Sequence, residues 1–523
     1  MTVIAEASVP VLVVGAGPTG ITAATLLAQY GIRCLVLDRY ASAYPQPRAV
    51  HLDDEVHRII ARLGVSAEFS AISRPAMGLR LLDHDFRLLA EFRRDADDSV
   101  HGYPQANMFD QPELEALLRA NLKNYPAVEL RGDVDVTDIR QLDHNRARVT
   151  FTDRSTGARH QVEADYVLGC DGANSITRTS IGAQMDDLGF EQRWLVADVV
   201  TDAELDQWDG VHQVCDPVRA ATYMRIGPTR YRWEFRLLPG ESVDDYRTPT
   251  ALRRLIGPWV DGVDDERLDV VRVAEYTFRA QLADRWRDRN VFILGDAVHL
   301  TPPFIGQGMG SGMRDAMNLA WKLAAVINNV LPAGVLDTYE SERKPHARLM
   351  IRLALGMGWA MTAGGRLGNV IRRSLAPRLH VIPGLRTRLV DSSTPPLRRS
   401  ALIVKSWRPH GLAGTLCPNP VIDDAVRLDA RLGNGFALVT VKPLEPSLRQ
   451  ELQLRGATVI TAQPGTELAQ WLHGGRALAA VVRPDRTVMQ AGARLRPLCD
   501  AIPRLAANEL PRQPMSVRTA EKR

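Results

Sequence analysis

The sequence predicts a mixed α/β protein of several domains, and three observations carry this prediction. Residues 9–38 follow the pattern strand, glycine-rich turn, helix, strand, which is typical of a parallel βαβ unit. Residues 186–285 are rich in strand patterns and show little helical periodicity. A further alternation of strands and helices begins near residue 396. We therefore expect four segments, with the first and third forming one domain around the second: 1–185, 186–285, 286–395 and 396–523.

Length and charge set the first limits on function. At about 150 residues per domain, the 523 residues suffice for about three domains. The 65 Lys and Arg residues exceed the 61 Asp and Glu residues by only 4, too few to indicate a nucleic acid or an anionic membrane as partner. The apolar stretch between Arg352 and Arg366 is too short to span a bilayer. We expect neither a nucleic-acid partner nor a membrane span.

The cysteines indicate the redox environment. The 5 cysteines are far apart and odd in number, and no C-x-x-C motif is present. This usage predicts reduced thiols and gives no sign of a zinc site or a redox dithiol, so we expect no metal. The first residues include Glu6 and no basic segment, so we also expect no targeting segment and a cytoplasmic location.

The first βαβ unit carries a glycine motif. In Gly15-Ala16-Gly17-Pro18-Thr19-Gly20, the first glycine permits a tight turn and the second admits a pyrophosphate close to the backbone. The third allows the helix to pack closely on the strand, and the helix N-terminus favours phosphate. Asp38 ends the second strand, within reach of a ribose hydroxyl. These features together predict a dinucleotide site.

Two later motifs narrow the choice between NAD and FAD. Asp171-Gly172 follows the strand pattern of "ADYVLGC", and Gly295-Asp296 follows "RNVFIL". A loop rich in proline and glycine then covers residues 302–312, and an amphipathic helix begins near Ser311 and includes residues 313–327. A further helix with proline in its first turn is expected over residues 112–123.

With these three motifs in this order and spacing, residues 9–345 resemble the class A FAD-dependent aromatic hydroxylases, which have the p-hydroxybenzoate hydroxylase-like fold. The resemblance implies a Rossmann-type FAD-binding domain with an inserted β-rich substrate domain. Four stretches are most similar to family members that hydroxylate 3-(3-hydroxyphenyl)propionate: 47–55, 215–220, 232–241 and 306–323. The segment from residue 396 resembles, more weakly, the thioredoxin-like domain of phenol hydroxylase-type members. Because it lacks a dithiol, we expect a structural or homodimer-forming role for it.

The resemblance implies a set of FAD-binding residues. Asp296 would accept hydrogen bonds from the ribityl hydroxyls, which would satisfy a carboxylate at the end of a buried strand. The helix after the glycine loop would aim its N-terminus at the flavin and stabilise the negative charge of the reduced ring. The full set is Gly15, Gly17, Gly20, Asp38, Arg39, Arg48, Gln111, Asp171, Gly295, Asp296, Pro303, Gly306 and Gly308.

The resemblance also implies the reaction. NADH or NADPH reduces FAD, dioxygen reacts with the reduced cofactor, and one oxygen atom enters a phenol ring ortho or para to its hydroxyl. The expected substrate is 3-(3-hydroxyphenyl)propionate or 3-hydroxycinnamate, in aromatic catabolism. For the substrate side we select His51 as a candidate base, Arg219 for the carboxylate, and Tyr223 for an aromatic pocket. His51 departs from the propionate hydroxylases, which tend to carry glycine there.

Other interpretations stay open at this point. The protein could be a tailoring hydroxylase for a polyketide or antibiotic phenol, which a larger apolar pocket would favour. A flavin halogenase would be expected to show a W-x-W-x-I-P stretch, which is absent, and a related reductase or an assembly flavoprotein without turnover are further alternatives. Residues 343–410 hold 14 Lys and Arg but a single acid, Asp391. They predict either a solvated face with a linker or a basic docking face.

Overall fold

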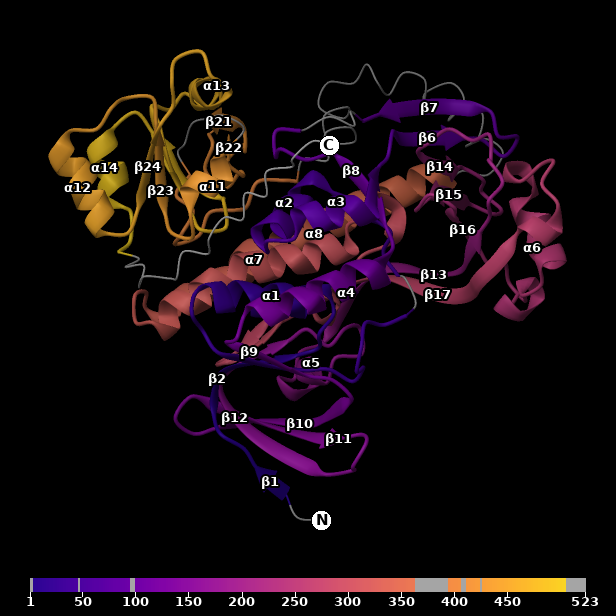
Figure 1. Ribbon diagram of the computed structural model, residues 1–523, viewed down its shortest axis with the longest axis horizontal. Coiled ribbons are helices and arrows are strands. Elements are labelled where there is room, and N and C mark those ends of the chain that lie inside the picture. Colours follow the sequence, from indigo (N-terminus) through magenta and orange to yellow (C-terminus); the bar gives the residue numbers. More distant parts are fainter. Residues whose placement is uncertain are drawn as a thin grey trace, which may run out of the picture.

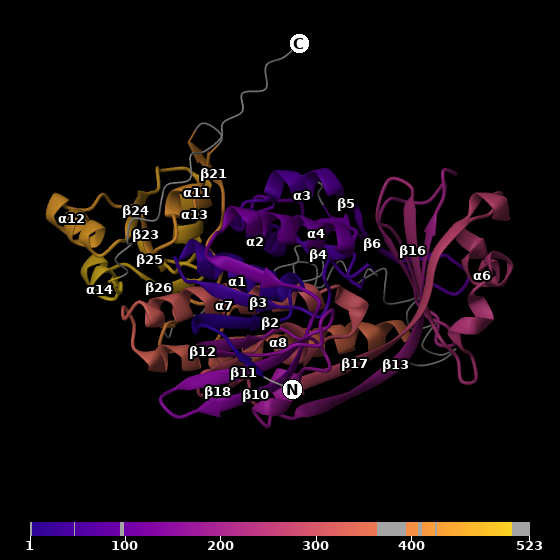
Figure 2. The same ribbon diagram turned by 60° about the horizontal axis from the view of Figure 1, so that its bottom comes forward.

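The computed structural model describes residues 3–45, 48–94, 99–362, 394–405, 411–423 and 426–504. Figures 1 and 2 show a central body crossed by two long helices, α7 (Gly308–Ile327) and α8 (Asp337–Thr362). A strand-rich body lies at one end of these helices, and a smaller α/β body lies at the other.

The central body is built on a nine-stranded sheet. The predicted βαβ unit is confirmed as β2 (Val9–Val14), α1 (Pro18–Gln29) and β3 (Cys34–Leu37), with β2 and β3 paired in parallel. On its other side β2 pairs in parallel with β12 (Arg159–Gly169). Strands β2 and β3 are continuous apolar runs because both faces of the sheet are covered there. The remaining strands are β1 (Val3–Ala5), β9 (Val128–Arg131), β10 (Val134–Leu142), β11 (Arg146–Asp153), β18 (Arg287–Asp288) and β19 (Val291–Ile293).

Helices and a small sheet complete this body. Helices α1 and α7 pack against each other, and α7 begins at Gly308, three residues before the predicted start near Ser311. The predicted helix over 112–123 is present as α4 (Gln111–Asn121). The other elements are α2 (Asp54–Arg62), α3 (Ser66–Ile72), α5 (Ile176–Ser180), and the three-stranded sheet of β4 (His51–Asp53), β5 (Ser73–Pro75) and β8 (Ala106–Phe109).

The strand-rich body is an eight-stranded sheet in the order β20-β17-β13-β16-β15-β14-β6-β7. Two of its strands, β6 (Gly78–Leu82) and β7 (Leu88–Arg93), come from the segment expected to belong wholly to the first domain. A helix that the sequence did not predict, α6 (Pro249–Ile256), covers one face. The other strands are β13 (Met185–Val200), β14 (Val211–Val214), β15 (Ala221–Arg225), β16 (Arg230–Arg236), β17 (Asp269–Ala283) and β20 (His299–Leu300).

The C-terminal body has a four-stranded sheet in the order β24-β23-β25-β26. Strand β24 (Thr458–Thr461) is parallel to β23 (Ala437–Thr440), whereas β25 (Ala479–Val482) and β26 (Val488–Gly492) are antiparallel additions. The three predicted strands and the helix α13 (Glu467–Gly474) are therefore present. The further elements are β21 (Val421–Asp423), β22 (Val426–Arg427), α11 (Leu428–Leu432), α12 (Pro446–Leu454) and α14 (Leu495–Asp500).

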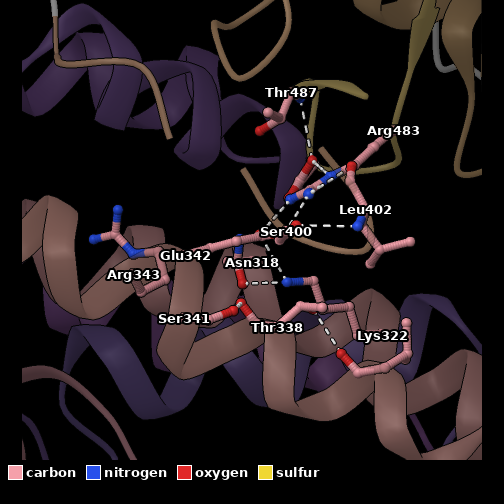
Figure 3. A network of polar contacts seen from close by, with 12 residues as sticks. Asn318, Lys322, Thr338, Ser341, Glu342, Arg343, Ser400, Leu402, Arg483 and Thr487 are labelled. Carbon is pink, nitrogen blue, oxygen red and sulfur yellow. Dashed lines mark hydrogen bonds and ion pairs between the residues drawn. The ribbon is translucent and has the colours of Figure 1, made fainter. Parts of the chain in front are cut away.

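A buried ionic network joins the C-terminal body to the long helices (Figure 3). Glu342 of α8 accepts hydrogen bonds from Lys322 of α7 at 2.9 Å and from Arg483 at 2.9 and 3.0 Å. All three side chains are fully buried. Ser400 donates to the same carboxylate at 2.6 Å. The contact between the bodies is therefore specific and shielded from solvent.

The basic segment is only partly described, because residues 363–393 and 406–410 lie outside the described residues. Within α8, Arg343 does not belong to a solvated face, as one interpretation expected. It is buried and donates to Asp315 at 2.8 Å. No helix in the described part of the chain is long and apolar enough to cross a membrane. All five cysteines are described and free of disulfides.

Candidate active site

A cavity of about 1780 Å³ lies between the glycine-motif edge of the central sheet and one face of the eight-stranded sheet. The turn after β2, the end of β3, the end of β12 and the start of α7 supply one part of its wall. Strands β13 to β17 supply the opposite part. The predicted motifs, which are up to almost 300 residues apart in sequence, therefore meet at one site.

The glycine motif has the geometry that a bound pyrophosphate needs. Gly15 has φ +100°, and a Cβ there would lie 2.4 Å from the carbonyl oxygen of Cys170. A Cβ on Gly20 would lie 1.9 Å from the carbonyl oxygen of Gly15, which confirms close packing of helix on turn. At Gly17 a Cβ would meet nothing within 4 Å, although this residue lines the cavity. Gly15 and Gly20 are therefore required by the fold, whereas Gly17 leaves open space beside the helix N-terminus.

Asp38 fixes the glycine turn from the end of β3. Its Oδ2 accepts the backbone N–H of Ala16 at 2.5 Å, and its Oδ1 accepts that of Tyr40 at 2.8 Å. Arg119 of α4 lies 3.2 Å from Oδ1. Asp38 and its neighbour Arg39 both line the cavity. The carboxylate is thus held at the place where the motif puts a ribose.

Arg48 and Gln111 come together across the cavity wall. Gln111 Oε1 accepts the backbone N–H groups of Arg48 at 3.1 Å and of Ala49 at 2.6 Å. The carbonyl of Arg48 accepts a hydrogen bond at 3.0 Å from Arg232, which forms a fully buried ion pair with Asp198. The wall segment around Arg48 is therefore tied to both sheets, and both predicted residues line the cavity.

Asp171 lines the cavity, but hydrogen bonds within its own loop occupy its carboxylate. Oδ1 accepts the hydroxyl of Ser175 at 2.5 Å, and Oδ2 accepts the hydroxyl and the backbone N–H of Thr177 at 2.9 Å each. This arrangement shapes the turn before α5. Asp171 therefore presents the adjoining backbone of Gly172 and Ala173 to the cavity rather than a free carboxylate.

Asp296 provides the clearest test of whether the residues fit FAD. Its side chain is open to the cavity, yet its carboxylate has no hydrogen-bond partner among the described residues. Protein atoms around the cavity partly desolvate the carboxylate and raise its pKa, and the charge of Arg48 opposes this shift, although the side chain itself is exposed to the cavity. A carboxylate that faces the cavity without a protein partner is free to accept hydrogen bonds from the hydroxyls of a ligand. A ribityl chain has such donors, so the residues fit.

Gly295 holds this motif in place. It has φ +63°, and a Cβ there would lie 2.8 Å from Thr19 Oγ1 in the glycine motif. Its backbone N–H donates to Asp315 at 3.1 Å. Asp315 also contacts His299 at 2.8 Å in a fully buried pair. This buried pair gives His299 a structural role.

The loop before α7 presents bare backbone to the cavity. Gly306 has φ +61°, and a Cβ on Gly308 would meet nothing within 4 Å. Pro303, Gly306 and Gly308 all line the cavity. No side chain caps the first turn of α7, so its backbone N–H groups and the positive end of the helix dipole are available there. A flat ring with a partly negative edge fits this surface.

His51 lines the cavity at the start of β4, where it contacts an arginine that the sequence analysis missed. Arg94 Nη1 lies 3.2 Å from His51 Nε2. Since arginine can only donate, Nε2 is the acceptor. Burial and the charge of Arg94 lower the pKa of His51 to about 4, although Asp53 acts in the opposite direction. The imidazole is therefore neutral near pH 7, and its accepting nitrogen already has a donor.

Two selected residues do not lie in the cavity. Arg219 pairs with Glu241 at 2.5 and 2.9 Å and does not line the cavity. Tyr223 is 2% exposed and packs with Trp233 and Trp259 in the core under α6. The correction for Tyr223 follows from strand geometry, because successive side chains point to opposite faces of a sheet. Its neighbours Thr222 and Met224 line the cavity instead.

The cavity face of the eight-stranded sheet therefore consists of residues that the sequence analysis did not select. In the sequence "RYRWEFR" of β16, aromatic and polar residues alternate. The aromatic positions face α6, and Glu234 faces the cavity. The sequence shows this alternation, but it does not show which face of the strand is covered, because helix α6 was not predicted. The cavity-facing set on this sheet includes Leu79, Leu81, Trp194, Val196, Val211, Gln213, Thr222, Met224, Glu234 and Tyr276.

One group of possible metal ligands occurs in the described residues. Asp83, His84 and Asp85 bring one ligand atom each within 4.8 Å of one another in the turn between β6 and β7. The backbone N–H groups of Asp85 and Arg87 donate to Asp83 Oδ1. His84 and Asp85 are exposed. These contacts form an ordinary surface turn.

Comparison with known proteins agrees with this geometry. The chain belongs to the FAD binding domain family, whose model matches residues 8–354. It is thereby an FAD-dependent hydroxylase of the flavin monooxygenase class.

Two relatives show how far the similarity extends. A "Probable NADH-specific resorcinol 4-hydroxylase" from Rhodococcus jostii (strain RHA1) is 37% identical over 68% of this chain and 66% of its own length. A "3-(3-hydroxy-phenyl)propionate/3-hydroxycinnamic acid hydroxylase" from Burkholderia cenocepacia (strain HI2424) is 32% identical over 91% of this chain and 93% of its own length. The second match therefore includes the C-terminal body.

Solved structures share the fold over almost the whole chain. The flavin-dependent monooxygenase PieE, determined with FAD and substrate, gives a TM-score of 0.77 at 22% identity and covers 94% of this chain and 98% of its own. Aklavinone-11 hydroxylase, determined with FAD and aklavinone, gives 0.75 at 24% identity and covers 95% and 99%. At these identities the likeness concerns the fold.

Proposed function

We propose that this protein hydroxylates the ring of a phenolic aromatic acid, 3-(3-hydroxyphenyl)propionate or 3-hydroxycinnamate, with NADH or NADPH and dioxygen as co-substrates. The single observation that carries the proposal is the shared cavity. It brings the FAD motifs, including the unpartnered Asp296, to the same space as the polar face of the eight-stranded sheet. The printed activity of the Burkholderia cenocepacia relative supports this choice of substrate.

The residues of this chain would divide the work between cofactor and substrate. Gly15, Gly17, Asp38 and Arg39 would hold the ADP half of FAD, and Asp296 would bind the ribityl chain. Arg48, Gln111, Pro303, Gly306 and Gly308 would border the flavin ring, with the backbone beside Asp171 closing the wall. When bound, FAD accepts a hydride from the nicotinamide and supplies one atom of dioxygen to the ring. The cavity, once filled by cofactor and substrate, would exclude water from that step.

For the substrate carboxylate, Arg94 takes the place that the sequence analysis gave to Arg219. Arg94 lines the cavity. Burial lowers its pKa, and the charges of Asp53 and Asp54 raise it in part. A guanidinium is the apt partner for a carboxylate. We propose that His51 positions Arg94 through the contact at Nε2 rather than taking the phenolic proton itself.

A second candidate substrate is a neutral phenol such as resorcinol. The observation in its favour is Glu234, a buried carboxylate on the cavity wall that would repel a substrate carboxylate placed beside it. The relative from Rhodococcus jostii carries the corresponding printed name. The polyketide tailoring interpretation keeps support from the shared fold alone.

Three further proposals concern the whole protein. The order and directions of the four C-terminal strands support a thioredoxin-like domain. Its buried thiols support a structural or homodimer-forming role, because Cys417 stands alone and burial raises its pKa to about 12. The free cysteines support a cytoplasmic location. Light scattering on the purified protein measures the homodimer directly.

The test is oxidation of NADH and of NADPH by the purified yellow protein, with and without each phenol. We expect 3-(3-hydroxyphenyl)propionate to stimulate NADH or NADPH consumption and to yield an equimolar dihydroxylated product. Stimulation by resorcinol alone would favour the second candidate. No stimulation by either phenol, with FAD fully bound, would contradict both.

A further inference from the structure

The cavity wall holds a buried carboxylate, Glu234, on the strand-rich side. Glu234 lies at the middle of β16, with only 8% of its surface exposed, and it lines the cavity. Its carboxylate forms no hydrogen bond or ion pair with any other described residue. A buried polar group of this kind calls for an explanation, because an unpaired carboxylate is costly to bury.

The register of the sheet shows what surrounds Glu234. It lies opposite Thr222 of β15 and Val196 of β13, and Thr222 lies opposite Gln213 of β14. Gln213 donates to Thr222 Oγ1 at 2.9 Å. Glu234, Thr222 and Gln213 thus form one polar row across three strands, and all three line the cavity. The apolar residues Val196 and Leu81 extend the row on its two sides.

Local electrostatics keep Glu234 a competent base. Burial raises its pKa, the charge of Arg232 lowers it, and the charge of Asp198 raises it further. Arg232 is itself engaged in the buried pair with Asp198, so it does not form an ion pair with Glu234. A carboxylate with a raised pKa takes a proton from a phenol more readily than an ordinary surface carboxylate does.

We propose that Glu234 is the catalytic residue that accepts the phenolic proton of the substrate. This inference rests on the proposed function. The phenolic O–H bond breaks, a carboxyl O–H bond forms on Glu234, and the electron pair remains on the phenolic oxygen, where it increases the electron density of the ring. The proton returns when the product oxygen is protonated again. The step needs no oxidant or reductant beyond NAD(P)H and dioxygen.

The row also assigns a substrate orientation. The hydroxyl of the phenol points at Glu234, with the Gln213–Thr222 pair beside it, and the ring lies over Val196. A carboxylate on the substrate points away from Glu234, since two anions in a buried site repel each other. A neutral diphenol satisfies the same row without that constraint.

The test compares Glu234→Gln and Glu234→Asp with the control Glu275→Gln on β17. Glu275 does not line the cavity and pairs with Arg193 at the surface. In the FAD-loaded protein, we expect Glu234→Gln to lower kcat by about 10²- to 10⁴-fold with a smaller change in KM, and Glu234→Asp to restore part of it. The control keeps the wild-type kcat.

Two readouts do not depend on turnover. Difference absorbance of bound 4-nitrophenol reports its phenolate fraction. Because a neutral amide no longer repels the phenolate, we expect the ionisation midpoint to move to lower pH in Glu234→Gln. Because burial of the charge is costly, we also expect Glu234→Gln to raise Tm at neutral pH. A wild-type midpoint and kcat in Glu234→Gln would overturn the inference, as would a lower Tm with loss of FAD. Failure of the wild-type protein to respond to any phenol would instead overturn the proposed function.

Discussion

The charges of three residues on the cavity wall determine which groups of a cofactor or a substrate the cavity can bind. Asp296 and Glu234 are both carboxylates whose pKa burial raises, and neither has a hydrogen-bond partner among the described residues. Arg94 is the opposite charge in the same space. Charged groups without protein partners lower the stability of the fold, and such groups cluster at sites where a ligand can pair with them. Each of them therefore gives a distinct experimental signature.

We expect Asp296→Ala to purify with little FAD. The substitution removes the acceptor for the ribityl hydroxyls, and hydrogen bonds to a charged group contribute about 1.5–3 kcal/mol. FAD affinity should therefore fall by roughly 10- to 100-fold, as measured by the yellow absorbance per protein and by titration of the apoprotein. Asp206→Ala, at an exposed acid outside the cavity, is the control. Full FAD occupancy in Asp296→Ala would refute the role of Asp296.

Arg94→Met separates the two candidate substrates. It keeps an unbranched apolar stem but removes the charged guanidinium, so KM for 3-(3-hydroxyphenyl)propionate should rise by roughly 10- to 100-fold while KM for resorcinol stays near wild type. The neighbouring Arg93→Met is the matched control, because Arg93 is exposed and pairs with Glu91. An equal change in KM for both phenols would show that Arg94 does not bind the substrate carboxylate.

At the scale of elements, the junction of β2 and α1 separates residues that the fold requires from residues that the ligand requires. Gly15 and Gly20 have no room for a Cβ, whereas Gly17 has open space on the cavity side. Gly17→Ala should therefore keep the wild-type Tm of the apoprotein and weaken FAD binding by about tenfold or more, because the methyl group occupies pyrophosphate space.

The measurement for Gly17→Ala is calorimetric titration of the apoprotein with FAD, together with thermal unfolding. Gly474→Ala in α13 is the control, since a Cβ there also meets nothing within 4 Å but lies outside the cavity. Unchanged FAD affinity in Gly17→Ala would remove Gly17 from the cofactor site.

The elements also show what the sequence could and could not predict. The βαβ unit and the three motifs were predictable because apolar periodicity and glycine spacing are local signals. The addition of β6 to the second sheet was not, since it pairs with β14 more than 100 residues later and leaves no local mark. Tyr223 was misplaced for the same reason: strand alternation was readable, but the face covered by α6 was not. Arg94 lies within a run of charged residues, "RRDADD", and nothing in that run distinguishes an arginine that faces a cavity from one on the surface.

At the scale of the whole molecule, the network around Glu342 holds the C-terminal body on the long helices. Burial alone would raise the pKa of Glu342, but the charges of Arg483 and Lys322 together lower it well below its ordinary value. The stabilisation is therefore fully present above about pH 4.3, the ordinary pKa of glutamate, and is lost as the pH falls below it. The next residue of α8, Arg343, donates to Asp315, which also accepts the backbone N–H of Gly295 in the Gly295-Asp296 motif.

We expect Glu342→Gln to lower the free energy of unfolding by about 3–5 kcal/mol, because two buried cations lose their common anion. The loss is measured by urea unfolding at neutral pH, and the acid limb of the stability curve should flatten in the variant. Glu451→Gln, in a partly exposed pair with Arg455, should change stability by less than about 1 kcal/mol. Equal effects of the two substitutions would contradict a stabilising role for the buried network.

The central claim is that the protein inserts one atom of dioxygen into a phenol ring. The most direct measurement is mass analysis of the product formed from 3-(3-hydroxyphenyl)propionate, NADH and heavy-isotope dioxygen by the FAD-loaded protein. The account predicts a product that carries one heavy oxygen atom in its new hydroxyl group. A hydroxylated product that carries oxygen from water, or NADH oxidation without any hydroxylated product from this or another phenol, would contradict it.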